Sequence, residues 1–306
     1  MNRIKRKDLD MKHKSNCVAF LSLILLLANV TYAQDTTEER LDRIEAKLDT
    51  LLSYHQGITS ASEPGTILRD DSNLRWGIAG HSGSVLDKGY FVINHNNGWK
   101  IPYWVAYYLS ESNLQGGQSR TNDFRADPQL SIGQRSELAD YRNSGYDRGH
   151  NAPAAAFKRN REAMSTTFLL SNMTPQSPSL NRRIWKNLES EVRDLVGAHG
   201  EAWVVTGNLF LSSDSTFVAP TDFIGNGNVA VPTHCFKAIL STRDDGSFDM
   251  FAFLLPNLRD QIPGIPSDYV ISVDRLEEIS GYDFFPDLPD DIENALERQI
   301  ADVWPL

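Results

Sequence analysis

Short runs rich in aromatic and β-branched residues recur along the chain from about Leu74 onward, separated by polar and turn-forming stretches. Runs of this kind are typical of β-strands. They predict strands at residues 89–96, 104–110, 168–172, 202–211, 229–240 and 248–256.

Three other segments repeat apolar residues at every third or fourth position, with charged residues between them, which is the pattern of a helix. They predict helices at residues 181–200, 273–280 and 290–304. Strands therefore outnumber helices and seldom alternate with them. This order favours an α+β domain built around a largely antiparallel central sheet.

Residues 1–33 have the pattern of a secretory signal peptide. Several basic residues precede the apolar run Val18–Val30, and small residues follow up to Ala33. The run is shorter than the roughly 20 apolar residues that a membrane-spanning helix needs. We therefore expect cleavage near Ala33, a secreted or periplasmic location and no stable insertion in a membrane, with either Met1 or Met11 as the start.

Residues 34–57 are predicted to form a short amphipathic helix, because leucine and isoleucine recur at alternating spacings of three and four among charged residues. The pattern covers only about two heptads. Two interpretations stay open: a stalk through which residues 36–55 form a homo-oligomer, or a helix lying on the domain. Residues 58–73 have the small, polar composition of a linker, and 74–306 are predicted to be one domain.

The charge balance of the whole chain argues against a polyanionic partner, but one segment reverses it. Removal of residues 1–33 takes away six basic and two acidic residues, which leaves 24 basic against 38 acidic ones. From Arg142 to Lys186, however, eight basic residues stand against two acidic ones. A site for a polyanion is therefore compatible with an acidic protein, although a solvated basic face is the alternative interpretation.

That basic segment also carries candidate chemistry. His150 is a potential general base near neutral pH, and Asn181 offers a neutral oxygen to a hard metal ion. The potential phosphate-binding cations are Arg148, Arg182 and Arg183. Hydrolysis of a phosphodiester needs such groups, because water must lose a proton and the negative charge of the transition state must be neutralised.

The sequence "YDRGHNAPAAAF", followed about twenty residues later by "TFLLSNMTPQSPSLNRRIWKNLE", resembles the DNA/RNA non-specific endonucleases of the ββα-metal (His-Me finger) class, a family that includes endonuclease G. The resemblance extends over nearly all of residues 74–290. It implies a ββα-metal finger on the central sheet and an endonuclease domain over 74–306. The implied activity is metal-dependent cleavage of DNA and RNA with little sequence preference, which leaves 5′-phosphate ends.

The resemblance also implies roles for individual residues. His150 would be the general base, Arg148 would contact phosphate, and Asn181 would be the one protein ligand of Mg²⁺ or of another divalent ion such as Mn²⁺. Glu189 would bind the water shell of the metal. If both lie on one α-helix, the separation of eight residue steps from Asn181 to Glu189 corresponds to roughly 12 Å, so direct ligation of one ion by both is not expected.

Three further assignments complete the predicted site. Arg120 is the best match to an upstream arginine of the family, with Arg125 close by in the sequence. Asn172 is expected to orient the histidine or the metal waters. Asp147 is interpreted as a structural residue that pairs locally and holds the loop.

Two alternatives to a nuclease remain at this point. The first is a nucleic-acid-binding module without catalytic activity, against which the intact His150 and Asn181 argue. The second is a phosphodiesterase that acts on small diesters. A comparison of turnover on plasmid and on a chromogenic diester distinguishes the second alternative from a nuclease.

Overall fold

The computed structural model describes residues 72–300 except 82 and 244, all within the compact unit Gly57–Leu306. The predicted signal peptide at 1–33, amphipathic helix at 34–57 and nearly all of the linker at 58–73 lie outside the described residues. Within the described part, no helix is long and apolar enough to cross a membrane.

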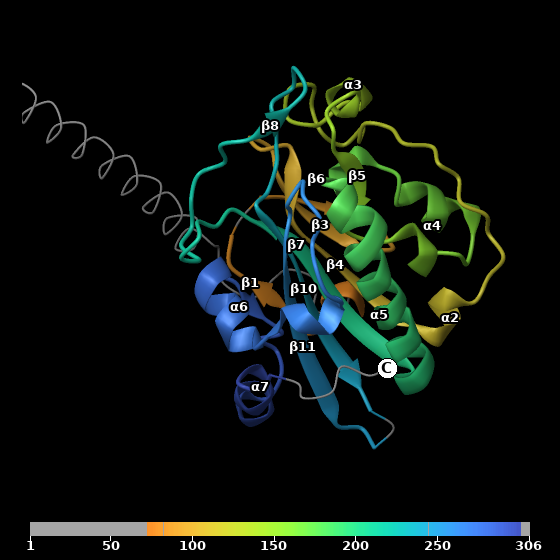
Figure 1. The fold of residues 1–306 in the computed structure, drawn as a ribbon. Helices are drawn as coiled ribbons and strands as arrows, with labels where there is room; N and C mark the ends of the chain where they lie inside the picture. The colour runs from red at the N-terminus through yellow and green to blue at the C-terminus, as the bar shows by residue number, and fades with distance from the viewer. Residues whose placement is uncertain (1–71, 82, 244, 301–306) are drawn as a thin grey trace, which may run out of the picture. The chain divides into compact units, whose positions relative to one another are not determined.

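A seven-stranded antiparallel sheet forms the centre of the domain (Figure 1). Its strands are β2 (Ser84–Asp87), β3 (Val92–Asn96), β4 (Ile101–Ser110), β7 (Glu201–Leu209), β10 (His234–Thr242), β11 (Phe248–Pro256) and β12 (Val270–Ile271). Their spatial order is β12-β11-β10-β7-β4-β3-β2. The predicted α+β class with a largely antiparallel sheet is confirmed.

Both faces of this sheet are covered, because side chains that alternate along each strand pack into two different cores. On β10, Cys235 and Ile239 pack with helix α5 (Trp185–His199). Phe236, Ala238 and Leu240 pack on the opposite face with helix α6 (Val273–Ser280) and with α7 (Asp290–Glu297). Helix α5 therefore lies on one side of the sheet, and the two C-terminal helices lie on the other.

A smaller unit on the α5 side has the arrangement of a ββα finger. Strand β5 (Asp147–His150) pairs antiparallel with β6 (Met173–Gln176), and the π-helical turn η4 (Leu180–Ile184) leads directly into α5. Gly149 is required in β5, because a Cβ at this position would lie 2.2 Å from Oε1 of Gln176.

Short elements connect these parts. The remaining helical segments are η1 (Ser72–Leu74), α2 (Glu111–Leu114), α3 (Leu138–Tyr141), η2 (Ala154–Ala156), α4 (Arg161–Thr166), η3 (Leu170–Asn172) and η5 (Pro266–Tyr269). The remaining strands are β1 (Ile78–Ala79), which pairs with β13 (Asp283–Phe284), and β8 (Phe223–Ile224), which pairs with β9 (Val229–Ala230).

Four sequence-based predictions need correction. The helix predicted at 290–304 is helical over Asp290–Glu297, and the described residues 298–300 are not helical. The strand predicted at 168–172 is in fact a turn that ends in η3, and the strand follows it at β6. The strand predicted at 229–240 is broken at Pro232, which separates β9 from β10. The helix predicted at 181–200 begins as the π-turn η4, so its first residues do not follow the α-helical register.

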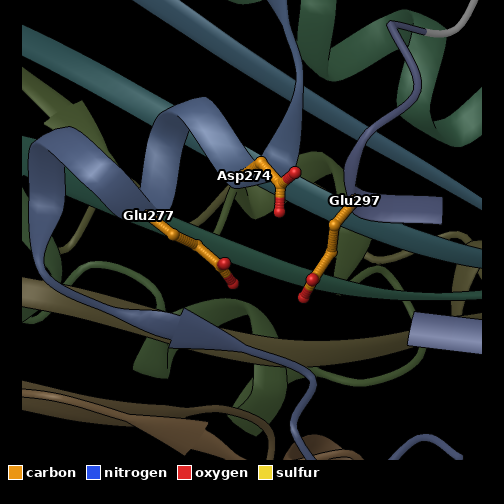
Figure 2. Close-up of side chains that lie close together, drawn as sticks. All are labelled: Asp274, Glu277 and Glu297. Carbon is orange, nitrogen blue, oxygen red and sulfur yellow. The ribbon is translucent and has the colours of Figure 1, made fainter. Parts of the chain in front are cut away.

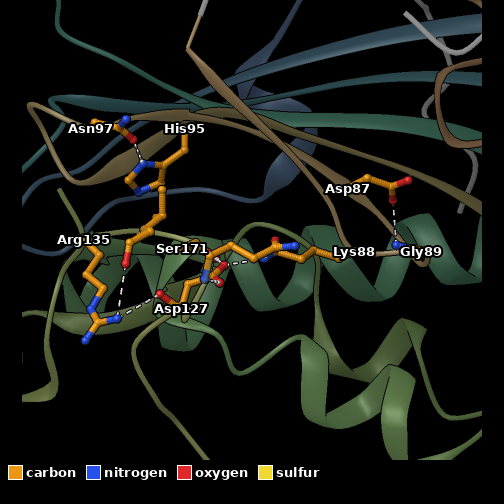
Figure 3. A network of polar contacts seen from close by, with 10 residues as sticks. Asp87, Lys88, Gly89, His95, Asn97, Asp127, Arg135 and Ser171 are labelled. Atoms are coloured by element: carbon orange, nitrogen blue, oxygen red, sulfur yellow. Dashed lines mark hydrogen bonds and ion pairs between the residues drawn. The ribbon is translucent and has the colours of Figure 1, made fainter. Parts of the chain in front are cut away.

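A buried ion pair holds the loop that follows β4 against the finger. Asp127 is fully buried, and its Oδ2 lies 2.5 Å from Nζ of Lys88 and accepts a hydrogen bond from Ser171 Oγ (Figure 3). Arg135 donates to the backbone oxygen of Asp127. Because Lys88 precedes β3 and Ser171 precedes β6, this carboxylate connects the edge of the sheet with the finger.

A group of carboxylates lies on the opposite side of the sheet. Asp274, Glu277 and Glu297 converge between α6 and α7, with their oxygens within 4.8 Å of one another (Figure 2). Burial, followed by the charges of its acidic neighbours, raises the pKa of Glu277 to about 8. The pKa of Glu297 is raised to about 7, again chiefly by burial.

These raised pKa values predict a pH-dependent stability. The folded chain binds more protons at Glu277 than the unfolded chain between about pH 4.5 and pH 8, so stability falls as pH rises through that window. Glu277→Gln keeps an acceptor for Phe284 N and removes the charge. We expect it to stabilise the protein at pH 8 by on the order of 1 kcal/mol, or about 2–4 °C in melting temperature, with a smaller gain at pH 5.

Glu278→Gln is the matched control, because Glu278 is exposed and pairs with Arg275 on the same helix. It is expected to give no gain at either pH. Equal gains for Glu277→Gln at pH 5 and pH 8 in a thermal melt would contradict the prediction.

Candidate active site

His150 ends strand β5 in a nearly closed environment. Its exposed fraction is 7%, and its ring packs against Phe168 at 5.0 Å and Phe124 at 5.7 Å between centroids. Burial, together with the charges of Arg120 and Arg148, lowers the pKa of His150 to about 3. The imidazole is therefore neutral near pH 7. Its Nε2 atom has no hydrogen-bond partner among the described residues and is available to accept a proton.

The same two aromatic rings position two arginines. The guanidinium carbon of Arg148 lies 4.0 Å from the centroid of Phe124, and that of Arg120 lies 4.8 Å from the centroid of Phe168. Stacking on a ring face orients a guanidinium without removing its charge. Arg120, Arg148 and His150 are thus gathered around one aromatic pair.

Arg125, the other candidate in the same loop, has a different position. Its Nη1 donates to the backbone oxygens of Asp123 and Ser165 and to the carboxylate of Asp123. These bonds hold the loop against helix α4, which lies between β5 and β6 in the chain. The geometry therefore favours Arg120 over Arg125 as the arginine of the site.

Asn172 is fully buried, and its amide bonds to the backbone. Nδ2 donates to the oxygens of Ala152 and Thr167, and Oδ1 accepts from the nitrogen of Ala152. These bonds also account for the turn that replaces the predicted strand at 168–172. Asn172 thus fixes the segment that follows His150. Among the described residues, it makes no hydrogen bond to the imidazole itself.

Asp147 connects the finger strand with the first turn of the helix. Its carboxylate accepts a hydrogen bond from Asn181 Nδ2 at 2.9 Å and two from Arg182, at 2.8 and 2.7 Å. Burial acts to raise the pKa of Asp147, but the bonds from Arg182 and Asn181 outweigh it and lower the pKa. Because Asp147 takes the amide nitrogen of Asn181, the amide oxygen is left to face a ligand.

Glu189 lies one helical turn after Trp185 on α5 and is half-buried. Trp185 donates from Nε1 to the backbone oxygen of His150 at 3.3 Å, which fastens the helix to the end of β5. Burial raises the pKa of Glu189, whereas the charges of Lys237, Arg193 and Arg120 oppose that shift. The carboxylate is thus surrounded by positive charge.

Arg193 is a residue of the site that was not predicted from the sequence. It lies one turn after Glu189 on the same face of α5, and its Nη1 is buried with no hydrogen-bond partner among the described residues. A buried guanidinium nitrogen without a partner is costly unless a ligand completes it. The spacing of four residues after Glu189 is the sequence signal that could have indicated it.

These residues fit a hard divalent ion. Asn181 presents an amide oxygen whose orientation is fixed by Asp147, and Glu189 provides a carboxylate nearby on the continuing helix. Oxygen donors in small number suit an ion that keeps most of its water, as Mg²⁺ does. Among the described residues, the two groups of three carboxylates that could hold an ion lie at the C-terminal helices and are separate from this site.

Comparison with known proteins agrees with this geometry. A family model described as DNA/RNA non-specific endonuclease matches residues 72–291. The chain belongs to the DNA/RNA non-specific endonuclease family. It is therefore a hydrolase that acts as a non-specific nuclease, and the sequence resemblance is confirmed.

Individual relatives support the same assignment. The chain is 35% identical to a nuclease of Syncephalastrum racemosum over 228 residues, covering 70% of this chain and 71% of the relative. It is 37% identical to human mitochondrial endonuclease G over 190 residues, covering 60% and 64%. A solved structure of an EndoG/EndoGI complex matches with a TM-score of 0.68 at 28% identity, covering 76% of this chain and 96% of that chain.

The comparisons contradict the predicted location. Relatives named endonuclease G of Homo sapiens, nuclease EXOG of Danio rerio and the mitochondrial nuclease of Saccharomyces cerevisiae are mitochondrial proteins. The prediction of a secreted or periplasmic protein is therefore wrong. It rested on the signal-like pattern of residues 1–33 alone, and hydrophobic pattern and basic charge near an N-terminus are shared by several kinds of targeting segment.

The contacts of Asp147 predict a measurable role in positioning. Asp147→Asn removes the charge that holds Arg182 and weakens the bond to Asn181. We expect the rate of DNA cleavage to fall by about 10–100-fold, which is typical of residues that orient a metal ligand, while the protein stays folded. Asp222→Asn is the control, because Asp222 is an exposed carboxylate that bonds to Tyr146 nearby. A loss of less than about threefold for Asp147→Asn would exclude this role.

Proposed function

We propose that this nuclease hydrolyses phosphodiester bonds of DNA and RNA with His150 as the general base and with Mg²⁺, or another divalent ion such as Mn²⁺, held by Asn181. The observation that carries the proposal is the unpartnered, buried Nε2 of a neutral His150 beside two arginines. A base needs a free nitrogen and neutrality, and a phosphate needs nearby positive charge.

Each protein group has a defined task in this mechanism. His150 accepts the proton of the attacking water. Arg148 and Arg120, stacked on Phe124 and Phe168, neutralise the oxygens of the phosphate. A hard divalent ion, when bound, supplies further positive charge to the phosphate and to the leaving oxygen.

Three further residues keep these groups in place. Asn172 bonds to the segment after His150, and Asp147 bonds to Asn181. Trp185 bonds to the backbone of His150. Attack on phosphorus with loss of the 3′ oxygen leaves a 5′-phosphate end. Low sequence preference follows if the contacts go mainly to phosphate and sugar.

An assay on two kinds of nucleic acid tests the proposal. The purified chain is incubated with plasmid DNA and with RNA, in Mg²⁺ or in EDTA, and the ends are identified by labelling with and without prior phosphatase treatment. We expect both substrates to be cut in Mg²⁺, no cleavage in EDTA, and 5′-phosphate ends. Cleavage that persists in EDTA, or ends with a 5′-hydroxyl, would overturn the proposal.

The alternative of a small-diester phosphodiesterase is tested in the same assay. A chromogenic diester lacks the neighbouring phosphates that the basic segment Arg142–Lys186 could contact. We therefore expect turnover on plasmid to exceed turnover on the diester by a large factor. The reverse order would favour the smaller substrate.

The amphipathic pattern of residues 34–57 supports a separate proposal about assembly. We propose that residues 36–55 contribute to a homo-oligomer, with help from the domain, because two heptads are short for an isolated coiled coil. Light scattering on chains that start at Gln34 and at Leu74 tests this. We expect a higher mass per particle only for the chain that starts at Gln34. Equal oligomeric states of the two chains would exclude a role of residues 36–55 in assembly.

A further inference from the structure

Lys237 is a completely buried lysine on the face of β10 that packs against α5. Its exposed fraction is 0%, and its strand neighbours on the same face, Cys235 and Ile239, belong to the core that includes α5. Its Nζ donates to Thr206 Oγ1 at 2.6 Å and to Tyr107 OH at 3.4 Å. Both partners are neutral, although a buried ammonium is costly unless an opposite charge balances it.

The ring of Trp185 lies between this lysine and the active site. Lys237 Nζ is 4.8 Å from the centroid of Trp185, whose Nε1 donates to the backbone oxygen of His150. Glu189 follows one turn later on the same face of α5. Of the charged groups that act on Lys237, Glu189 has the largest effect.

We propose that Lys237 is a positioning residue whose ammonium is the buried counter-charge of Glu189 and holds that carboxylate in place for the water shell of the metal ion. The inference rests on the role of Glu189 in the proposed function. Lys237 cannot itself reach the substrate, since its side chain ends within the interior of the domain on Thr206 and Tyr107.

The other cations near Glu189 are suited to a different task. Arg120 is exposed and Arg193 is half-buried on α5, so a phosphate of the substrate can pair with either of them. Only a charge that the substrate does not reach can balance Glu189 both before and after substrate binds. Lys237 has this property, because its ammonium is fixed by two hydrogen bonds beneath the helix.

A double-mutant cycle on the metal-free protein tests the pairing without any activity measurement. Lys237→Met, Glu189→Gln and the double variant are unfolded with denaturant in EDTA. In the wild-type background, Lys237→Met leaves Glu189 without its counter-charge. We expect Lys237→Met to change the unfolding equilibrium constant by a factor that is at least tenfold larger in the wild-type background than in the Glu189→Gln background. Equal effects in the two backgrounds would overturn the proposal.

Binding of Mn²⁺, followed by electron paramagnetic resonance, gives the second readout. Lys237→Met should raise the Kd for Mn²⁺ about 10–100-fold, as Glu189→Gln does, and the double variant should be no weaker than either. Ile239→Val is the matched control, because Ile239 is buried on the same strand and face. It should lower stability without changing the Kd. A Kd for Lys237→Met within about threefold of wild type would overturn the proposal.

If Lys237→Met does not fold, Lys237→Gln takes its place, because it keeps hydrogen bonding to Thr206 and Tyr107 without the charge. If neither variant folds, the proposal is wrong, because the sheet then needs the ammonium for folding itself. Failure of the proposed function has a different signature: the wild-type chain would then neither bind Mn²⁺ nor cleave nucleic acid. The unfolding cycle would still report whether Lys237 and Glu189 are paired.

Discussion

His150→Ala is expected to reduce the rate of DNA and RNA cleavage by about 10²–10⁴-fold, because the function that is lost is proton transfer from water. Binding of nucleic acid should remain close to that of wild type, since Arg148 and Arg120 hold their positions on Phe124 and Phe168. Cleavage rates and binding to an uncleaved oligonucleotide in EDTA are measured on the same preparations.

His199→Ala is the control for this prediction. His199 is the last residue of α5, fourteen residues after Trp185, and is not part of the ββα finger. We expect its cleavage rate to stay within about twofold of wild type. If His150→Ala retained activity within about threefold of wild type, the imidazole would not be the general base.

Asn181→Ala and Glu189→Gln are expected to lose activity in different ways, which the response to added Mg²⁺ distinguishes. Loss of Asn181 removes the direct oxygen ligand and the fixed position of the ion, so most activity should be lost at any tolerable Mg²⁺ concentration. Loss of the Glu189 charge should cost about 10–100-fold, and added Mg²⁺ should recover part of it. Titration of the cleavage rate against Mg²⁺ for both variants distinguishes the two roles.

The opposite result has a clear meaning. If Mg²⁺ rescued Asn181→Ala but not Glu189→Gln, the direct and the water-mediated roles would be exchanged. The π-turn η4 makes this test necessary, because the separation of roughly 12 Å between the two residues assumed a regular α-helix from Asn181 onward. The contact of Asn181 with Asp147 favours Asn181 as the direct ligand.

The sheet and the C-terminal helices were largely predictable from the sequence. Strands β3, β4, β7 and β11 coincide with runs of aromatic and β-branched residues, and α6 has the predicted bounds of 273–280. These elements bury a regular face, so the local pattern carries the information. Strand β6 was missed because it contains Pro175 and is short, and its partner β5 lies 23 residues earlier in the chain, beyond the reach of any local pattern.

The sequence indicated residues for the candidate site, but it did not indicate the side chains that support them. The motif and its spacing indicated His150, Asn181 and Glu189, since these residue types are typical of the chemistry. The aromatic pair Phe124 and Phe168 was not indicated, because in the sequence each looks like an ordinary core residue. Only the fold brings their ring centroids to 4.8 Å from each other. Tertiary contacts of this kind carry no periodic signal.

The burial of Lys237 was hidden for the same reason. It stands in the apolar run of β10, where a single lysine is usually placed at an exposed position. Only the packing of α5 over that face shows that its charge is enclosed, with Nζ 4.8 Å from the centroid of the Trp185 ring.

The central claim is metal-dependent hydrolysis with His150 as the base, and one experiment addresses it most directly. Wild-type and His150→Ala chains, purified side by side, are mixed in excess with one supercoiled plasmid, and the single-turnover cleavage rate is measured in Mg²⁺ and in EDTA. We predict rapid cleavage only for the wild type in Mg²⁺ and a rate lower by at least about 10²-fold for His150→Ala. Equal rates for the two chains in Mg²⁺, or wild-type cleavage that is unchanged in EDTA, would contradict it.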